Sequence, residues 1–213
     1  SLTPPFSLFD NKDYANLANN PSAGNYSQQL QEKYRWIEYH KWKFKSRTYT
    51  SLSGGNKCLV LMTRVEFGIL GSYNKSKKSP FETFYVGGDG TSGYTSTYAT
   101  ETIGMRGYDN GSLTPNGYSG YAYDRFTVEL RYPFMLNNST NIYGLVFAEG
   151  GNAWNSVRKF NPFDMKRSVG AGVRIFLPMV GLLGIDWAYG FDDVFGSKTY
   201  SGSHFHFILG QEF

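Results

Sequence analysis

The sequence predicts an all-β fold, a transmembrane antiparallel β-barrel, and three observations support that prediction. The 213-residue chain contains 17 tyrosines and 17 phenylalanines, but it has no run of about 18 apolar residues of the kind that marks a membrane helix. Apolar and polar residues instead alternate along strand-length segments, as they do where a barrel turns one face to lipid and the other to its lumen. The last segment alternates in the same way and ends on Phe213.

The C-terminal segment 203–213 shows this pattern most clearly. Alternate side chains of a strand share a face, so Phe205, Phe207 and Phe213 point the same way. The final strand of an outer-membrane barrel presents apolar groups to lipid and places an aromatic residue at the interface. Gly210 lies on the other face, where a glycine weakens strand pairing. We therefore expect these four residues to mark the closing strand of a barrel.

Residues 1–33 differ from the rest of the chain. They are rich in Asn, Asp, Ser and Pro and contain one short helical pattern, at 26–33, so we expect a strand end followed by a long periplasmic turn. Strand patterns begin at Tyr34, and we assign 34–213 to the barrel without a further domain boundary. A long Gly-, Ser-, Thr- and Tyr-rich loop is expected at 87–120, and a loop of that length usually has a function.

Most strand segments have one apolar face, expected to meet lipid, and one polar face, expected to line the lumen. The apolar faces carry Trp36, Trp42, Phe44, Leu61, Val65, Phe67, Phe126, Val128, Leu130, Val169, Val173, Ile185 and Trp187. The polar faces carry Lys41, Lys43, Lys45, Arg47, Arg64, Glu66, Arg125, Glu129, Arg131, Arg174 and Asp186. The segment 141–154 is apolar on both faces, so the pattern does not say which way Glu149 points.

The patterns predict eight strands, and the connections between them alternate between short and long, as on the two sides of an outer-membrane barrel. Eight strands could close a small barrel, or they could form the second half of a sixteen-stranded one. The expected strands are 34–52, 57–72, 81–87, 120–133, 141–154, 166–177, 180–191 and 203–213.

The composition argues against several functions. The net charge is +4, but the cations are interleaved with aromatics along strands and form no dominant tract, which disfavours nucleic-acid binding. Cys58 is the only cysteine, so disulfides and cysteine-based zinc sites have no basis. The segment 88–93 matches a dinucleotide-binding glycine pattern, but no helical pattern follows it. We expect no cofactor and no metal, since His204 and His206 lack an evident third ligand.

Four motifs, in this order along the chain, carry a resemblance to a known family. They are Phe81-Glu82-Thr83-Phe84-Tyr85-Val86-Gly87-Gly88, Met105-Arg106-Gly107-Tyr108, Thr127-Val128-Glu129-Leu130-Arg131-Tyr132-Pro133 and Phe147-Ala148-Glu149-Gly150-Gly151-Asn152-Ala153-Trp154. With the aromatic C-terminus, they closely resemble the C-terminal half of the barrel in the BamA family of outer-membrane assembly factors, insertases of the surface-antigen superfamily.

The resemblance implies a role for the loop motif Met105, Arg106, Gly107 and Tyr108. In the family, a Val-Arg-Gly-Phe/Tyr motif lies at the tip of a long extracellular loop that folds back into the barrel; Met105 replaces the valine here. The family arginine pairs with carboxylates on the barrel wall, which by position are Glu129 and Glu149. Glu129 also lies on a predicted lumen face, where a buried guanidinium needs a carboxylate partner.

The resemblance further implies localisation in the bacterial outer membrane, with periplasmic POTRA domains and eight more strands upstream of this segment. The implied partners are outer-membrane lipids, unfolded outer-membrane protein clients and accessory assembly-machinery subunits. The implied activity is insertion of clients at a seam that opens beside the closing strand. A secretion pore of the same superfamily and a passive porin are alternatives.

Enzymatic activity is not expected. Glu129, Glu149 and Asp186 could in principle perform acid–base chemistry, but carboxylates among arginines are ordinary in a barrel lumen. The sequence has no Gly-x-Ser-x-Gly elbow. A membrane enzyme remains the weaker alternative, and loss of lipid or peptide turnover on replacing Glu129 or Ser168 would support it.

Overall fold

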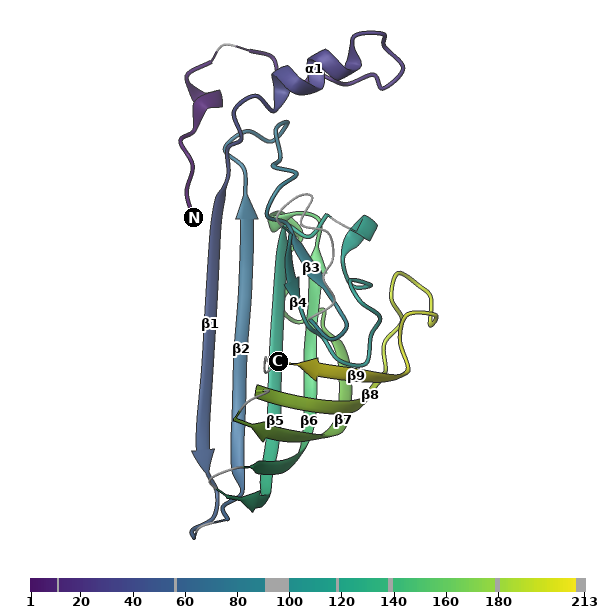
Figure 1. Ribbon diagram of the computed structural model, residues 1–213. Coiled ribbons are helices and arrows are strands. Elements are labelled where there is room, and N and C mark those ends of the chain that lie inside the picture. Colours follow the sequence, from purple (N-terminus) through teal and green to yellow (C-terminus); the bar gives the residue numbers. More distant parts are fainter. Residues whose placement is uncertain are drawn as a thin grey trace.

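A computed structural model of the chain describes residues 1–10, 12–55, 57–90, 100–117, 119–137, 140–178 and 181–209. Its main element is one curved antiparallel sheet, with the strand order β1-β2-β5-β6-β7-β8-β9 (Figure 1). The strands are β1 (His40–Ser51), β2 (Val60–Gly71), β5 (Ala122–Leu136), β6 (Asn141–Trp154), β7 (Lys166–Leu177), β8 (Gly181–Gly190) and β9 (Ser203–Leu209).

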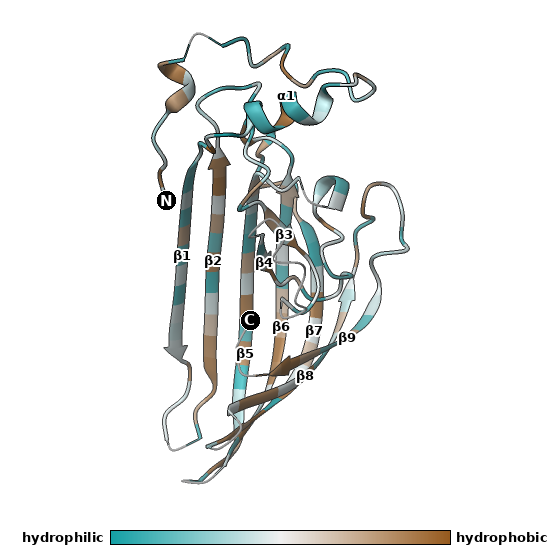
Figure 2. Ribbon diagram, turned by 45° about the horizontal axis from the view of Figure 1, so that its top comes forward, coloured by the Kyte–Doolittle hydropathy of each residue, from teal (hydrophilic) through white to brown (hydrophobic). Residues whose placement is uncertain are grey.

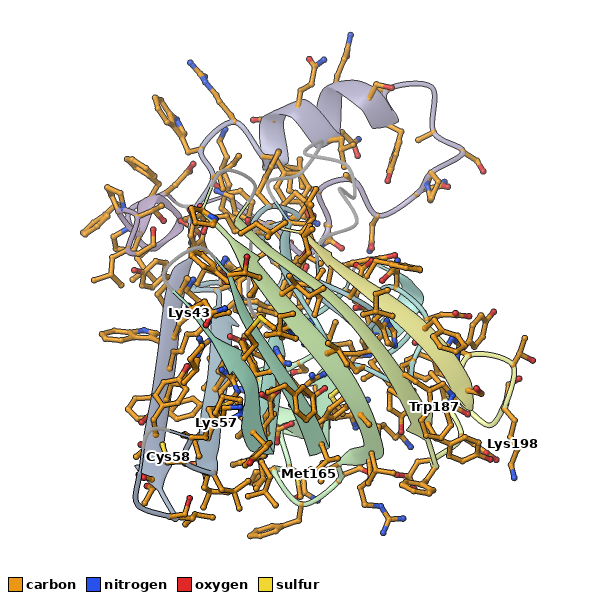
Figure 3. The ribbon with its side chains drawn as sticks, turned by 60° about the horizontal axis from the view of Figure 1, so that its bottom comes forward. Lys43, Lys57, Cys58, Met165, Trp187 and Lys198 are labelled. Carbon is orange, nitrogen blue, oxygen red and sulfur yellow. The ribbon has the colours of Figure 1, made fainter. Side chains whose placement is uncertain are left out.

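The two faces of this sheet confirm the prediction of an apolar outer face and a polar inner face. Hydrophilic and hydrophobic bands follow one another along β2 and β5 (Figure 2), as expected when alternate residues face opposite sides. Arg64 of β2 is 1% exposed, whereas its apolar neighbour Phe67 is 39% exposed. Lys43, labelled in Figure 3, forms an ion pair with Glu101 of the segment between β2 and β5, whereas Trp187 of β8 is exposed on the outer face. The wall therefore has an apolar outside and a polar concave side, as a transmembrane barrel requires.

The strand β6, whose facing the pattern left open, is now assigned. Leu145, Phe147 and Glu149 are buried on the concave side, whereas Val146 is exposed. Both faces are apolar in sequence because the inward residues Leu145 and Phe147 pack with Ala188 of β8, and Phe147 also lies beneath the Arg106 guanidinium of the loop. Glu149 therefore points into the lumen.

The expectation of eight wall strands is wrong, because the segment 81–87 leaves the wall. Only β3 (Phe84–Val86) forms there, and it pairs in parallel with β4 (Glu101–Ile103) in a separate two-stranded sheet. Phe84 and Val86 are almost fully buried, and Phe84 packs against Tyr123 of the wall with ring centroids 4.6 Å apart. The apolar alternation that resembled a wall strand is the packing face of an inserted loop.

Of the two alternatives left open by the sequence, the described residues do not form a self-closed small barrel. Within the described residues no ladder joins β1 to β9, and these two strands are the edges of the sheet. Unpaired backbone groups at such edges need partners in a membrane. The sixteen-stranded alternative stays a prediction.

The connection 72–121 between β2 and β5 folds over the concave side of the sheet (Figure 1). It contains β3, β4 and the short helix η3 (Pro115–Gly117). Its buried apolar residues form one cluster with residues of the wall: Tyr39, Leu70, Phe84, Val86, Ile103, Met105, Tyr108, Leu113, Tyr123, Ala153 and Val194. The range 87–120, predicted as a loop, lies within this insertion.

The N-terminal segment contains η1 (Phe6–Leu8) and α1 (Tyr26–Lys33) and lies beyond one end of the wall. His40, the first residue of β1, pairs with Gly71 at the point where the long loop begins. Residues 1–39 and that loop therefore lie on the same side. Adjacent antiparallel strands place the start of one beside the end of the other. The predicted periplasmic turn at 1–33 and the predicted extracellular loop that carries Met105–Tyr108 therefore cannot lie on opposite sides of the membrane.

The remaining helical turn, η4 (Val157–Lys159), lies between β6 and β7. Among the described residues, no helix combines the length and the apolar character needed to cross a membrane.

The outward face of β5 gives a first prediction. Val128 is 48% exposed in the middle of the strand, so Val128→Arg should place a cation in hydrocarbon and lower the free energy of unfolding by about 2–4 kcal/mol. Urea titration of the full-length protein in lipid vesicles measures the change. Val128→Leu is the matched control and should remain close to the native value. Equal stability of the arginine variant would contradict a lipid-facing surface here.

Candidate functional site

The tip of the long loop, Met105–Tyr108, is held at both ends by backbone pairing. Gly88 and Met105 exchange two hydrogen bonds of 3.0 Å, and Tyr108 bridges to Ser201 in the segment before β9. Met105 and Tyr108 are fully buried. One end of the tip is therefore held within the loop itself, and the other is held to the segment before β9.

Arg106 at this tip is fully buried and binds three carboxylates from three different strands. Its Nη2 lies 2.6 Å from Glu129 of β5 and 2.7 Å from Glu149 of β6. Its Nη1 donates to Asp186 of β8 at 2.9 Å. The planar guanidinium suits such recognition because its donors are fixed in a fork. One loop residue thus connects three wall strands.

The wall supplies a second cation to each of these carboxylates. The pairs are Arg131 with Glu129, Arg125 with Glu149 and Arg174 with Asp186, each with an N···O distance of 2.7 Å. Buried charges are tolerated when their partners and hydrogen bonds are well placed. The seven side chains therefore form one alternating network of four guanidinium groups and three carboxylates.

Further contacts orient the Arg106 side chain and backbone. The guanidinium carbon lies 3.4 Å from the centroid of the Phe147 ring, a stacking arrangement that favours arginine. The Arg106 backbone N–H donates to Glu149 Oε2 at 3.0 Å. Burial works against the charge, but Glu149, Glu129 and Asp186 outweigh it and raise the pKa of Arg106 above its ordinary value. The residue stays cationic inside the lumen.

Gly107 lets the loop backbone approach β8 directly. Its φ is +87°, and an added Cβ would lie 2.8 Å from the Gly190 nitrogen and 2.9 Å from Ser168 Cβ. Its N–H donates to His206 Nε2 of β9 at 2.9 Å. A side chain at this position would meet both backbone strain and a rigid neighbour. The glycine therefore allows the tip to reach the last two strands.

Tyr108 completes the motif. Its hydroxyl donates to the Arg167 carbonyl at 2.7 Å, and burial raises the pKa of the phenol to about 12. The tyrosine remains a neutral donor at physiological pH, so this contact to β7 persists.

The structure brings the predicted residues Arg106, Glu129 and Glu149 into direct contact. Sequence reasoning missed Asp186 as the third carboxylate, although its position on a polar strand face was a usable signal. It also missed Phe147 beneath the guanidinium, because the facing of β6 was open. His206, considered from the sequence as a metal ligand without a third partner, accepts a hydrogen bond from the loop tip.

The predicted closing-strand residues divide into two groups. Phe205 and Phe207 of β9 are 67% and 65% exposed on the outer face, while Gly210 and Phe213 lie outside the described residues. Within the described ranges, no three His, Cys, Asp or Glu side chains gather as a metal site. The arrangement at Arg106 is suited to docking a loop on the wall.

An apolar-out, polar-in antiparallel wall with a loop docked on its concave side defines a class of outer-membrane β-barrel proteins. The Omp85 superfamily domain matches residues 6–213, and this chain belongs to the Omp85 superfamily. It is therefore a bacterial outer-membrane protein.

A relative gives a more specific comparison. The outer membrane protein assembly factor BamA of Neisseria meningitidis serogroup B (strain ATCC BAA-335 / MC58) is 28% identical over 131 residues. The match covers 56% of this chain and 14% of that protein. The family is thus an outer-membrane protein assembly or secretion family.

The network predicts the effect of removing Arg106. Arg106→Ala should remove one cationic partner from each of Glu129, Glu149 and Asp186. It should lower the free energy of unfolding by about 3–5 kcal/mol, because a carboxylate that loses its partner stays buried with its desolvation cost uncompensated. The temperature at which the full-length protein loses its heat-resistant folded band on a gel measures this loss.

Arg106→Lys is the matched control. It retains the charge but cannot contact three carboxylates in a plane, so its stability should lie between those of native protein and Arg106→Ala. Unchanged heat resistance in Arg106→Ala would contradict the structural importance of the network.

A second set of ion pairs ties β4 to β1. Glu101 lies 2.8 Å from Lys43 Nζ and 3.0 Å from Lys41 Nζ. Burial favours the neutral acid, but the hydrogen bonds from Lys43 and Lys41 outweigh it and hold the pKa of Glu101 below its ordinary value of 4.5.

A pH dependence follows from this pairing. A carboxyl group with a lowered pKa in the folded state stabilises it above the unfolded pKa, and that contribution is lost as the pH falls through the folded value. Hydrogen exchange of the Glu101–Ile103 amides, corrected for intrinsic rates, should therefore accelerate below pH 4.5 more in native protein than in Glu101→Gln. Identical pH profiles for the two proteins would show that the pairing does not hold β4.

Proposed function

We propose that this chain is the seam-bearing part of an assembly factor that folds β-barrel proteins and inserts them into the outer membrane. The single observation that carries the proposal is the Arg106 network. It links β5, β6 and β8 through one loop tip, and Gly107 extends the link to His206 of β9. The loop thereby braces the strands that lead to the edge of the wall.

The edge strand β9 is suited to templating a client strand. In the described residues it pairs with β8 only, so its other side offers backbone donors and acceptors. A client strand that pairs there satisfies its own backbone groups before it meets hydrocarbon. The exposed side chains of Phe205, Phe207 and Leu209 already face lipid, as those of an inserted client would.

The proposed mechanism is lateral opening. The closing strand separates from the first strand of the full-length barrel, a client strand adds to the open edge, and the folded client leaves into the membrane. The proposed partners are outer-membrane lipids, unfolded outer-membrane protein clients and accessory subunits. These partners are proposed and not inferred from the relative, because the match covers only 14% of that protein. No enzymatic step is needed.

The docked loop argues against a passive porin. A porin needs an open lumen, whereas Arg106 and its buried neighbours occupy the concave side of this wall. Single-channel recordings of the full-length protein should therefore show small, flickering conductance. A large and stable conductance would favour the porin instead.

A reversible cross-link tests the seam. In a Cys58→Ser background, Phe205→Cys is combined with a cysteine on the first strand of the full-length barrel. Oxidation should abolish insertion of an unfolded barrel client into vesicles, followed by the client's heat-modifiable band, and reduction should restore it.

The matched control locks strands that are not expected to separate. Trp187 and Phe205 face each other across β8 and β9, so a Trp187→Cys/Phe205→Cys cross-link leaves the seam free and should permit insertion. Normal insertion by protein fully cross-linked at the seam would rule out lateral opening.

A further inference from the structure

A separate cavity lies on the concave side of the wall, between β1, β2, β5 and the β4 segment. Its volume is about 210 Å³, which is room for several water molecules or a small oxyanion. Four cations line it: Lys43, Lys45, Arg64 and Arg125. The Arg106 side chain does not line it, and Arg125, which pairs with Glu149, is the one member of the loop-tip network that does.

Arg64 is the unusual group in this cavity. It is 1% exposed, and within the described residues its Nε and Nη2 have no hydrogen-bond partner. Its nearest carboxylate is that of Glu66, whose Oε1 lies 3.6 Å from Arg64 Nε. Arg131, Arg125 and Arg174 each have a carboxylate at 2.7 Å. A buried guanidinium without such a partner is costly.

The carboxylates around the cavity are largely taken by other cations. Glu66 Oε1 lies 3.0 Å from Lys45 Nζ, and Glu101 is paired with Lys41 and Lys43. Asp89 is the third acid in the lining, and Arg64 has no hydrogen bond to it through Nε or Nη2. Among the described residues, the acids in the lining therefore leave Nε and Nη2 of Arg64 without a hydrogen bond.

Strand register adds like-charge repulsion to this imbalance. Arg47 of β1 is directly opposite Arg64 of β2, and like charges in directly opposite positions destabilise a sheet. Arg125 of β5 also lines the same cavity. A negative charge placed among these groups would offset the repulsion and supply acceptors to Arg64.

We propose that this cavity is an anion site in the lumen, in which Arg64, with Lys45 and Arg125 beside it, binds the oxygens of a phosphate or a carboxylate. Arginine forks bind both groups through paired hydrogen bonds. The anion is either a dissolved phosphate-type ion or a carboxylate side chain contributed by another part of the full-length barrel. The inference stands apart from the insertase proposal, because it concerns how the lumen is neutralised.

Thermal unfolding of the full-length protein in detergent tests the site, with inorganic phosphate as the probe and chloride at equal ionic strength as the reference. Arg64→Met keeps the side-chain volume and removes the charge. Lys198→Met removes an exposed cation in the loop before β9, which does not line the cavity (Figure 3), and is the matched control.

Two outcomes support the proposal and separate the sources of the anion. For a dissolved ion, phosphate raises the midpoint of native protein and of Lys198→Met by a few degrees, and the rise disappears in Arg64→Met. For a resident carboxylate, phosphate has no effect, Arg64→Met lowers the midpoint at neutral pH, and the deficit vanishes once acid protonates the orphaned carboxylate.

Two other outcomes overturn it. In the first, phosphate has no effect and the thermal unfolding midpoint of Arg64→Met equals or exceeds that of native protein, which would mean that the guanidinium has no anion partner. In the second, phosphate has no effect and the lower midpoint of Arg64→Met does not change with pH, which would mean that Arg64 acts by packing alone. If Arg64→Met does not fold, Arg64→Lys replaces it. That variant loses the fork, so the phosphate response or the acid-sensitive deficit should shrink severalfold, and behaviour identical to native protein would again overturn the site.

Discussion

The structure depends on burying one guanidinium group inside a barrel lumen. A charge removed from water is stable only where opposite charges and hydrogen bonds surround it, and Arg106 meets this condition by drawing Glu129, Glu149 and Asp186 together. These carboxylates belong to three strands, so the condition can be met only when loop and wall are both in place. By pairing with all three carboxylates, the Arg106 side chain connects β5, β6 and β8 to one another.

That connection explains why the inserted loop and the wall behave as one packed body. The loop contributes Phe84, Val86 and Met105 to the apolar cluster, and the wall contributes Leu70 and Tyr123. Polar and apolar contacts therefore both hold the insertion on the wall. The result is a braced set of strands ending at β9, whose outer edge keeps its capacity for pairing. A surface that templates a client strand requires rigid strands next to an edge strand whose backbone groups can still pair.

Much of the fold was predictable because side-chain alternation determines which residues face lipid, and this held for β2, β5, β7, β8 and β9. The Arg106–Glu129 contact was also accessible, since Glu129 lay on a lumen face. The segment 81–87 was misread because an apolar face looks the same whether lipid or a loop core covers it. Asp186 was missed because pairing across distant strands depends on curvature, which no local pattern records. The side occupied by residues 1–33 required the pairing of His40 with Gly71.

The distribution of the three carboxylates over separate strands has a consequence for assembly of the protein itself. Shifting one strand by a single residue would send its acidic side chain to the hydrocarbon and bring an apolar one inside. The tip of the loop could then no longer be neutralised. Docking of Arg106 therefore stabilises the wall only when its strands pair in the correct register. The loop thus selects against strands that pair out of register.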